Sequence, residues 1–493
     1  MITERDIWEL DQRINLRGVH VDIDSAQKII TSIKRREAER LTRFSELVRY
    51  EVSGPRSYVA LAAWVGQEIG QNLDSIDKAA TAELLKDPQL PAHVREVLQI
   101  KAELSKSSVA KYEAMVNRAH KGRVMGLFMY HGASTGRWAA RGIQPHNMPR
   151  DSYNDDQYDL ALESMDDFEW LSALLDDPYY AASKMLRGTI CAPEGYELVC
   201  ADFSAIEGRG LAYLADETWV LDEYRRIDTE GGPDMYMVTA ATILGKPADE
   251  ITKAERQSPG KIAELACGYQ GAAGAVRQFG GGEGMTDEEV VEAIVAPWRA
   301  TRPRIVNFWY DVERAAIKAI KRPGGRAFTV GKIHFRVKNA YLQIKLPSGR
   351  VLRYFQPKVE NVRKRKIKDF NPEHNEYCTC ADCGYSSESI TYWGVKIVDG
   401  KTTSQWTKIE TYGGKLTENI VQAFCRDLLA EAMVRLDREG YQLVMHVHDE
   451  AVAEEKIGSK DLEEFCAIMS EVPEWAEGMP IRAEGWVGKR YRK

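Results

Sequence analysis

Long apolar runs, a secretory leader and a dense cysteine framework are all missing from this sequence of 493 residues. No apolar run approaches the roughly 20 residues that cross a bilayer as a helix, which excludes a helical membrane protein. The first residues, Met1–Asp6, do not have the pattern of a signal peptide. Because only 8 cysteines are present, we expect a cytoplasmic protein with reduced thiols and no disulfide framework.

An excess of basic charge is also missing, since 67 Lys and Arg residues stand against 74 Asp and Glu residues, a net charge of −7. The overall charge therefore does not indicate a nucleic-acid partner. It does not exclude one, because a basic cleft can coexist with an acidic exterior. The hydrophobic fraction of 44% is that of an ordinary soluble globular protein, and the length allows several subdomains.

The stretch Leu198–Arg209 predicts a buried strand that ends in a carboxylate. Leu198-Val-Cys-Ala201 is a short apolar run, and Asp202 follows where we expect the strand to stop. Ser204 and Glu207 have the spacing of a capping box, which predicts a helix start. A strand-to-helix junction can aim a carboxylate into a cleft. From this stretch alone, a solvated turn residue is the alternative.

A second pair of acids, Asp449 and Glu450, lies between two apolar runs. The flanks Leu443–Val447 and Ala451-Val-Ala453 predict a β-hairpin with both acids at its centre. Magnesium is typically held by one or two carboxylates together with phosphate oxygens. Asp202 and Asp449, far apart in the sequence, could therefore share divalent metals with bound phosphates.

The stretch Arg256–Gly271 predicts a helix with an anion site at its start. Ser258-Pro259 suits the N-cap and the first helical position. Lys261, Leu265 and Tyr269 recur every four residues and share one face. A lysine in the first turn opposes the helix dipole, which makes sense where a phosphate docks. The alternative places Leu265 and Tyr269 in a core and Lys261 in solvent.

Three further stretches have features of surfaces that contact nucleic acid. The segment His131–Arg150 is rich in glycine, arginine and amides, and predicts a functional loop that reads phosphates and base edges. The segment 25–50 predicts a densely charged helix, either a solvated face or a face along a phosphate backbone. Lys101–Tyr112 places basic and hydroxyl residues on a helix, which favours contact with a nucleic-acid backbone.

A basic run, Arg363–Lys366, precedes a short cluster of cysteines. Three cysteines and a histidine could bind Zn²⁺ as a Cys₃His site, but the usual paired CxxC spacing is absent. Reduced surface cysteines are the alternative, and both interpretations stay open. The four residues are His374, Cys378, Cys380 and Cys383.

Four of these stretches, taken in order, resemble the motifs of the family A DNA polymerases, the bacterial DNA polymerase I type. The order is that of the family and covers most of the chain, and four ordered motifs are highly specific. Asp202–Arg209 resembles motif A, Arg256–Gly271 resembles motif B, His448-Asp449-Glu450 resembles motif C, and Ser134–Arg137 with Asn147–Pro149 resembles the segment that follows the thumb.

The resemblance implies an α/β (α+β) right-hand fold with an antiparallel-sheet palm, a helical thumb and helical fingers. Gly413–Gln422 is similar to phage and prophage members, which places the expected protein in a bacterial or phage-infected cell. The expected ranges are 1–24 for an N-terminal palm-associated segment, 25–123 for the thumb, 124–212 for the palm with motif A, 213–335 for the fingers with motif B, and 336–493 for the palm with motif C and a Cys-containing insertion around 357–390.

The resemblance also implies a reaction, in which a primer 3′-hydroxyl attacks the α-phosphate of a dNTP and releases pyrophosphate. Asp202 and Asp449 would hold two Mg²⁺ ions, and Glu450 would support that site. Lys261 would neutralise the triphosphate and protonate the leaving group. These four are the expected catalytic residues.

The remaining implied roles concern the nucleotide and the primer–template. Glu207 would crowd the sugar 2′ position and reject ribonucleotides, and Tyr269 would stack near the templating base. The other dNTP contacts are Arg256, which stands five rather than four residues before Lys261, and Leu265, which stands where an aromatic is usual. The expected primer–template contacts are Arg137, Asn147, Gln422 and His448.

Fewer than thirty residues precede the thumb-like helix, which leaves no room there for the family's 3′–5′ exonuclease domain. We therefore expect a monomeric polymerase without proofreading, which a separate exonuclease or replication accessory protein would have to supply. A single-subunit RNA polymerase shares the palm chemistry, but Glu207 argues against it. A metal-dependent nuclease would not need Lys261 and Tyr269 on one helix, and a non-catalytic DNA scaffold would not need both Asp202 and Asp449.

Overall fold

The computed structural model describes residues 2–104, 108–365, 384–398 and 401–493. The predicted zinc ligands His374, Cys378, Cys380 and Cys383 lie outside these ranges. The structure mixes many helices with two larger antiparallel sheets of four and six strands. Within these ranges, no helix is long and apolar enough to cross a membrane.

The four-stranded sheet carries both predicted acid pairs. Its strands are β5 (Tyr196–Phe203), β12 (Leu443–Val447), β13 (Glu450–Lys456) and β14 (Ala483–Gly488), in the order β12-β13-β5-β14. Every neighbouring pair is antiparallel. The strand ending near Asp202 and the hairpin around Asp449 are therefore confirmed. Their apolar residues are buried in the sheet, which explains why a simple hydrophobic pattern predicted them.

Helices cover this sheet. The long helix α19 (Gly413–Arg438) is buried along most of its length and packs against α10 (Ile206–Ala215), α18 (Pro303–Lys321), α20 (Leu462–Ser470) and α1 (Glu4–Arg17). Helix α1 ends at Arg17, and Val19–His20 forms the short strand β1. A capping box between Thr3 and Asp6 starts α1.

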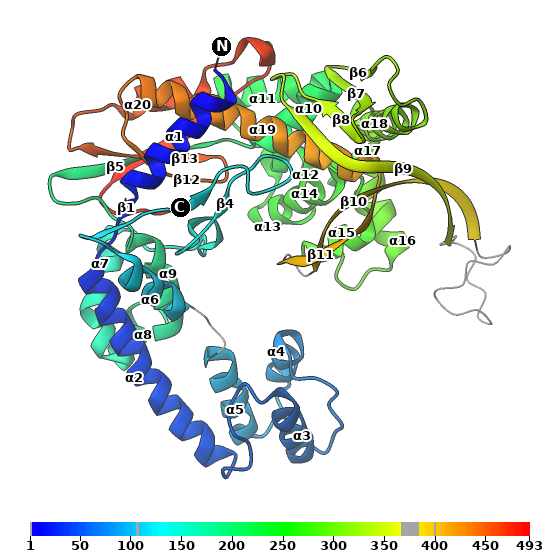
Figure 1. Ribbon diagram of the computed structural model, residues 1–493. Helices are drawn as coiled ribbons and strands as arrows, with labels where there is room; N and C mark the ends of the chain where they lie inside the picture. The colour runs from blue at the N-terminus through cyan, green and yellow to red at the C-terminus, as the bar shows by residue number, and fades with distance from the viewer. Residues whose placement is uncertain (1, 105–107, 366–383, 399–400) are drawn as a thin grey trace.

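A helical arm leads away from the sheet, as Figure 1 shows. Its elements are α2 (Ile23–Leu47), α3 (Tyr58–Ile69), α4 (Lys78–Lys86), α5 (Ala92–Leu104) and α6 (Ser108–Arg118). The acidic stretch 151–180 forms α7 (Asp155–Glu163), α8 (Phe168–Leu174) and the start of α9 (Pro178–Gly188). Tyr158 and Leu171 are buried there, and α7 and α9 pack on α2.

A second helical group follows α10. Its elements are α11 (Thr218–Glu230), α12 (Met235–Leu244), α13 (Lys253–Glu255), a π-helical turn (Arg256–Lys261), α14 (Ile262–Cys267), α15 (Ala273–Gln278), α16 (Asp287–Val290), a second π turn (Val291–Val295), α17 (Ala296–Thr301) and α18. A capping box between Thr286 and Glu289 starts α16.

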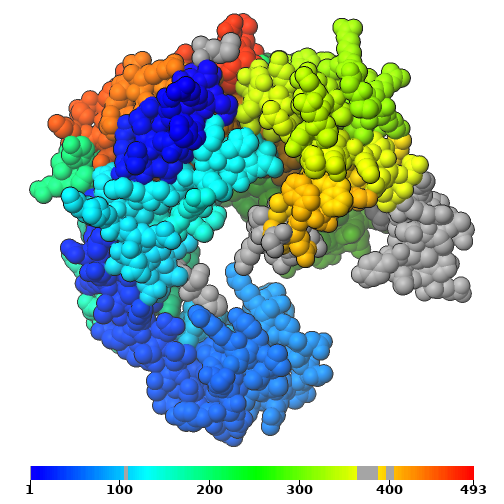
Figure 2. All heavy atoms as spheres, in the orientation of Figure 1, coloured from blue at the N-terminus to red at the C-terminus, as the bar shows by residue number. Residues whose placement is uncertain are grey.

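The six-stranded sheet packs against α18. Its strands are β6 (Phe328–Val330), β7 (Ile333–Lys338), β8 (Tyr341–Lys345), β9 (Val351–Arg365), β10 (Gly384–Val398) and β11 (Lys401–Thr411), each antiparallel to the next. Two short pairs, β1 with β2 (Arg123–Val124) and β3 (Phe128–Met129) with β4 (Ala139–Ala140), complete the strands of the described ranges. Figure 2 shows the molecule hollowed between the α3–α5 end of the arm and β11.

Candidate active site

Two carboxylates of the four-stranded sheet face each other across adjacent strands. Asp202 on β5 is the direct cross-strand partner of Glu450 on β13. The Lys493 ammonium lies between them, and its Nζ donates to Asp202 Oδ2 at 2.9 Å and to Glu450 Oε2 at 3.4 Å. Tyr491 donates its hydroxyl to the same Glu450 oxygen at 3.2 Å. The sheet therefore holds two like charges around one cation.

Asp449 stands in the turn between β12 and β13. The preceding residue, His448, has a φ of 57°, a left-handed conformation that bends the chain. The carbonyl of Asp449 accepts a hydrogen bond from the amide of Phe203 at 3.2 Å, which ties the turn to the end of β5. The strand register therefore gathers Asp202, Asp449 and Glu450 at one end of the sheet.

Burial makes two of these carboxyls unusually easy to protonate. It raises the pKa of Asp449 to about 6, against the opposing effect of Arg137, whose Nη2 lies 4.0 Å from Asp449 Oδ1. It raises the pKa of Glu450 to about 7, with Asp202 adding to the rise and Lys493 opposing it. Both shifts follow from desolvation and neighbouring negative charge, so a bound cation would favour the ionised forms.

The Glu207 carboxylate is held from two sides. Arg137 donates to Oε1 at 2.5 Å, and the Tyr269 hydroxyl donates to Oε2 at 3.1 Å. The N-cap of α10 is Ala205, which has left-handed backbone angles and provides no side-chain hydrogen bond. The capping box predicted for Ser204 and Glu207 is therefore wrong, because two partners distant in sequence take the carboxylate.

Arg137 is positioned by two arginines that anchor the glycine-rich segment before it. Arg350 donates to the Thr135 carbonyl at 2.8 Å, and Arg426 donates to the Gly136 carbonyl at 3.0 Å. Gly136 has a φ of 86°, and a Cβ there would lie 2.3 Å from Arg350 Nη1. The turn therefore requires glycine, and it fixes the direction in which Arg137 leaves the loop.

The other residues predicted to bind the nucleotide do not contact these carboxylates. Arg256 donates to Asp234 Oδ2 at 2.7 Å. Ser258 has extended backbone angles that interrupt the helical run, but its hydroxyl forms no cap bond within the described residues. Lys261 lies in the first turn after this break and makes no hydrogen bond or ion pair with any described residue, while Leu265 is 43% exposed.

The predicted primer–template residues are dispersed around the cluster. Asn147 is exposed in the loop after Arg137. Gln422 donates to Glu418 Oε1 at 3.1 Å on α19. His448 adjoins Asp449 directly. Of these four, Arg137 and His448 therefore lie beside the carboxylates in the structure.

A small cavity of about 30 Å³ lies beside Asp449. It is lined in part by His146, His446, His448 and Arg137, and it has room for about one water molecule. The buried Nε2 of His446 has no hydrogen-bond partner within the described residues, which such a water would satisfy. Burial lowers the pKa of His446 well below its usual value and that of His146 to about 4, so both imidazoles are neutral near pH 7.

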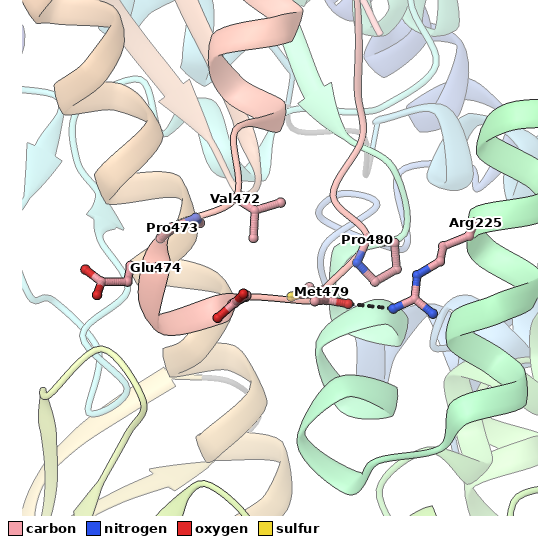
Figure 3. A pocket seen from close by; sticks show the side chains of 8 residues that line it. Arg225, Val472, Pro473, Glu474, Met479 and Pro480 are labelled. Carbon is pink, nitrogen blue, oxygen red and sulfur yellow. Dashed lines mark hydrogen bonds between the residues drawn. The ribbon is translucent and has the colours of Figure 1, made fainter.

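A larger pocket of about 490 Å³ lies between α11 and the segment that follows α20. Figure 3 shows Arg225 reaching toward this segment, where its Nη2 donates to the Gly478 carbonyl at 2.6 Å. Pro473, Met479 and Pro480 also line it. The lining contains none of the predicted site residues, so this pocket is separate from the carboxylate cluster.

The carboxylate cluster fits a divalent cation. Glu450 Oε1 is buried without a hydrogen-bond partner among the described residues, and the Lys493 ammonium already stands where a cation would bind two carboxylates. In the described ranges, no group of three or more His, Cys, Asp or Glu residues has the geometry of a metal site, so a cation at these carboxylates would need further oxygens from a ligand or water.

Lys493 and Tyr491 are the main site residues that sequence reasoning missed. Both come from Gly488–Lys493, where the alternation of glycine, basic residues and tyrosine gives only a general signal of an anion-facing segment. The residue they contact, Glu450, lies about forty positions earlier. Only the pairing of β14 with β5 brings that segment to the carboxylates.

Comparisons with known proteins identify relatives of this chain. Residues 61–277 match the model of DNA polymerase family A. The chain is 37% identical over 495 residues to a DNA polymerase of Bacillus phage SP02, covering 100% of this chain and 71% of the relative. It is 26% identical over 248 residues to DNA polymerase I of Aquifex aeolicus, covering 50% of this chain and 36% of the relative.

A solved structure, the POL domain of Pol1 from M. smegmatis in complex with DNA primer-template and dNTP, has the same overall fold. The TM-score is 0.65 at 16% sequence identity, over 99% of this chain and 70% of the solved chain. The mixed helix-and-sheet right-hand architecture expected from the sequence is thereby confirmed.

Proposed function

The chain belongs to DNA polymerase family A, and on this premise we propose that it extends a primer 3′-hydroxyl with dNTPs under the direction of a template strand. The observation that carries the proposal is the cluster of Asp202, Asp449 and Glu450 at one end of a rigid antiparallel sheet. Nucleotidyl transfer by two metal ions needs carboxylates held in this way, close together and on elements that do not move.

Asp202 and Asp449 are the proposed ligands of two Mg²⁺ ions. When bound, the ions activate the attacking hydroxyl and stabilise the leaving oxygen. Glu450 is buried, and its Oε1 has no hydrogen-bond partner among the described residues. Tyr491 and Lys493 hold its other oxygen, which fixes the carboxylate orientation.

The nucleotide is proposed to lie between the carboxylates and the helix that contains Lys261. Lys261 has no partner among the described residues, so its ammonium is available to a triphosphate. Arg256 would have to leave Asp234 before it could contribute. Leu265, exposed one turn further along, would pack on the nucleotide. Glu207, held by Tyr269 and Arg137, would stand at the sugar 2′ position and exclude a hydroxyl there.

Primer and template are proposed to contact Arg137, Asn147, Gln422 and His448. The subdomain assignment follows the predicted ranges: α2–α6 as the thumb, α11–α18 as the fingers, and the four-stranded sheet with α19 as the palm (Figure 1). The hollow between the helical arm and β11 in Figure 2 is where a duplex would lie under this assignment.

We also propose that these 493 residues do not excise a mismatched 3′ end. Excision needs its own carboxylate-bound metals. A labelled primer with a terminal mismatch, incubated with Mg²⁺ and no dNTP, should keep its length. Shortening abolished by a carboxylate substitution outside Asp202 and Asp449 would contradict this.

Primer extension with single nucleotides tests the central proposal. On a template of known sequence with Mg²⁺, only the complementary dNTP should be added, and the matching rNTP should be a poor substrate. Preferential use of rNTPs would favour an RNA polymerase instead. Binding of primer–template without any incorporation would favour a non-catalytic scaffold.

A further inference from the structure

One face of the six-stranded sheet carries a row of aromatic side chains. Directly paired residues of antiparallel strands point to the same face. Tyr341 on β8 pairs with Phe355 on β9, Phe355 pairs with Trp393 on β10, and Trp393 pairs with Lys408 on β11. Trp406, two residues before Lys408, extends the same face. The ring of Phe355 lies 5.1 Å from that of Tyr341 and 6.2 Å from that of Trp406.

This row faces solvent because the opposite face forms the core. Leu342, Ile344 and Tyr354, which alternate with the row residues, are buried, and the sheet packs on α18. By contrast, Trp406 is 57% exposed. A tryptophan this exposed on a regular strand contributes little to folding, so its ring is available to a ligand.

The same face is basic. Cross-strand pairing places Arg336 and Lys338 on β7, Lys345 on β8 and Arg353 on β9 on the aromatic side. All four are exposed, and none forms an ion pair with an acid among the described residues. Glu360, an acid on this side, is already neutralised by Lys408 at 2.8 Å. Glu410, two residues after Lys408, also lies on this side, but the four cations outnumber the two acids. The face therefore combines one exposed and three half-buried aromatic residues with an excess of positive charge, on a protein whose net charge is −7.

We propose that this aromatic–basic face, made of Tyr341, Phe355, Trp393, Trp406, Arg336, Lys338, Lys345 and Arg353, binds single-stranded DNA, namely the unpaired part of the template. The inference rests on the proposed polymerase function. Unpaired bases stack on exposed aromatic rings while their phosphates contact cations along the same groove or face. Duplex DNA offers phosphates but no free base faces, so the rings select single strands.

The position of the face agrees with a template path. In Figures 1 and 2, β11 lies at the rim of the hollow opposite α3–α5, so a strand leaving that hollow can reach the sheet. Pairing with a second copy of the chain is disfavoured. A twofold contact would set this basic face against its own copy, and like charges across an interface oppose association.

Binding of primer–templates with one duplex and two overhang lengths tests the proposal. The labelled substrates would carry template 5′ overhangs of about 2 and about 12 nucleotides, and fluorescence anisotropy would give both affinities. The wild-type chain should bind the long overhang more tightly. Trp406→Ala should remove most of that difference, on the order of tenfold for one lost base stack, without changing the short-overhang affinity.

A second variant and a matched control make the result specific. Arg353→Gln keeps the aromatic row and should weaken long-overhang binding with a reduced salt dependence. Trp170→Ala removes a tryptophan that is 56% exposed on α8 and should leave the overhang difference unchanged. Tryptophan emission should also be quenched by a single strand in the wild type and less so in Trp406→Ala.

Two results would overturn the inference. One is an overhang difference that survives both Trp406→Ala and Arg353→Gln. The other is a concentration-dependent dimer in sedimentation that Trp406→Ala dissolves, which would make the face a contact between copies. Single-nucleotide incorporation on the short-overhang substrate distinguishes failure of the single-strand proposal from failure of the proposed polymerase function. The wild type and both variants should all incorporate the nucleotide. A wild type that does not incorporate it would refute the polymerase proposal itself.

Discussion

Asp202 and Glu450 are direct cross-strand neighbours, and the ammonium of Lys493 contacts both, at 2.9 Å and 3.4 Å. Like charges placed opposite each other on adjacent strands repel, so this part of the sheet needs a cation to be stable in the ionised form. The protein supplies one from its own chain. A divalent ion at the same carboxylates would have to take over the place of that ammonium.

Loss of either aspartate should abolish incorporation without abolishing DNA binding. Asp202→Ala or Asp449→Ala removes a proposed metal ligand worth several kcal/mol in the transition state, so single-turnover dNTP addition should fall roughly a thousandfold or more. Rapid-quench kinetics would measure this, and anisotropy would check primer–template affinity. Glu484→Ala, which changes an exposed acid opposite Asp202 on β14, is the matched control. Near-normal incorporation in either aspartate variant would refute the metal assignment.

Lys493→Ala should raise the affinity of the DNA-free protein for Mn²⁺. The substitution removes both a competitor for the carboxylate oxygens and a repelling charge, an effect of about 1 kcal/mol or roughly fivefold after solvent screening. Electron paramagnetic resonance of free Mn²⁺ would measure it directly. Lys489→Ala, an exposed lysine on the same segment, should change nothing. Weaker Mn²⁺ binding in Lys493→Ala would show that the ammonium does not compete with the metal.

The histidine cluster behind Asp449 should make the protein less stable in acid. Burial lowers the pKa of His146 to about 4, whereas an unfolded histidine titrates near 6.5. Between these two pH values His146 binds a proton in the unfolded chain but not in the folded chain. The free energy of unfolding therefore falls as the pH drops from about 6.5 to about 4. The full loss is on the order of 3 kcal/mol.

Urea unfolding of the wild type and of variants at pH 5 and pH 7.5 measures how much His146 contributes to the pH dependence of the free energy of unfolding. His146→Gln should reduce the difference in stability between the two pH values, because glutamine does not titrate. His120→Gln, at an exposed position, should keep the wild-type difference. An unchanged difference in His146→Gln would mean that other groups dominate the acid sensitivity.

The sequence predicted those parts of the fold that local pattern determines. The apolar run before Asp202 and the apolar flanks of Asp449 and Glu450 predicted the strands that meet in the sheet. Buried strands are visible in a sequence as continuous or alternating apolar residues. It did not predict α1, although Ile7, Leu10 and Ile14 have helical spacing.

The contacts of the site were less predictable because they are tertiary. Glu207 has the spacing of a capping residue, yet its carboxylate binds Arg137 and Tyr269, which lie 70 and 62 positions away. The 291 positions between Asp202 and Lys493 leave no local signal of their contact. The fold must be known before the partner of such a carboxylate can be chosen. A local capping hydrogen bond contributes only about 1 kcal/mol, and a hydrogen bond to a charged residue distant in sequence can contribute more.

Substitutions at Glu207 and Tyr269 should change the choice between dNTPs and rNTPs in different ways. If the Glu207 side chain occupies the space of a 2′-hydroxyl, Glu207→Ala should raise the ratio of rNTP to dNTP efficiency by a factor on the order of 10² or more, because it removes a steric block together with a charge. Tyr269→Phe keeps the ring and the carboxylate but removes the hydrogen bond at 3.1 Å that orients Glu207. That bond is worth about 1–2 kcal/mol, so the ratio should rise by only about tenfold. Glu207→Gln, which keeps the size of the side chain and can still accept a hydrogen bond from Tyr269, should have a ratio close to that of the wild type.

The kcat/KM values for one matched pair, dATP and ATP opposite a template thymine, give all three ratios. If Glu207→Ala leaves the ratio unchanged while lowering both efficiencies equally, the carboxylate only anchors Arg137 and Tyr269, and sugar selection lies elsewhere in the site.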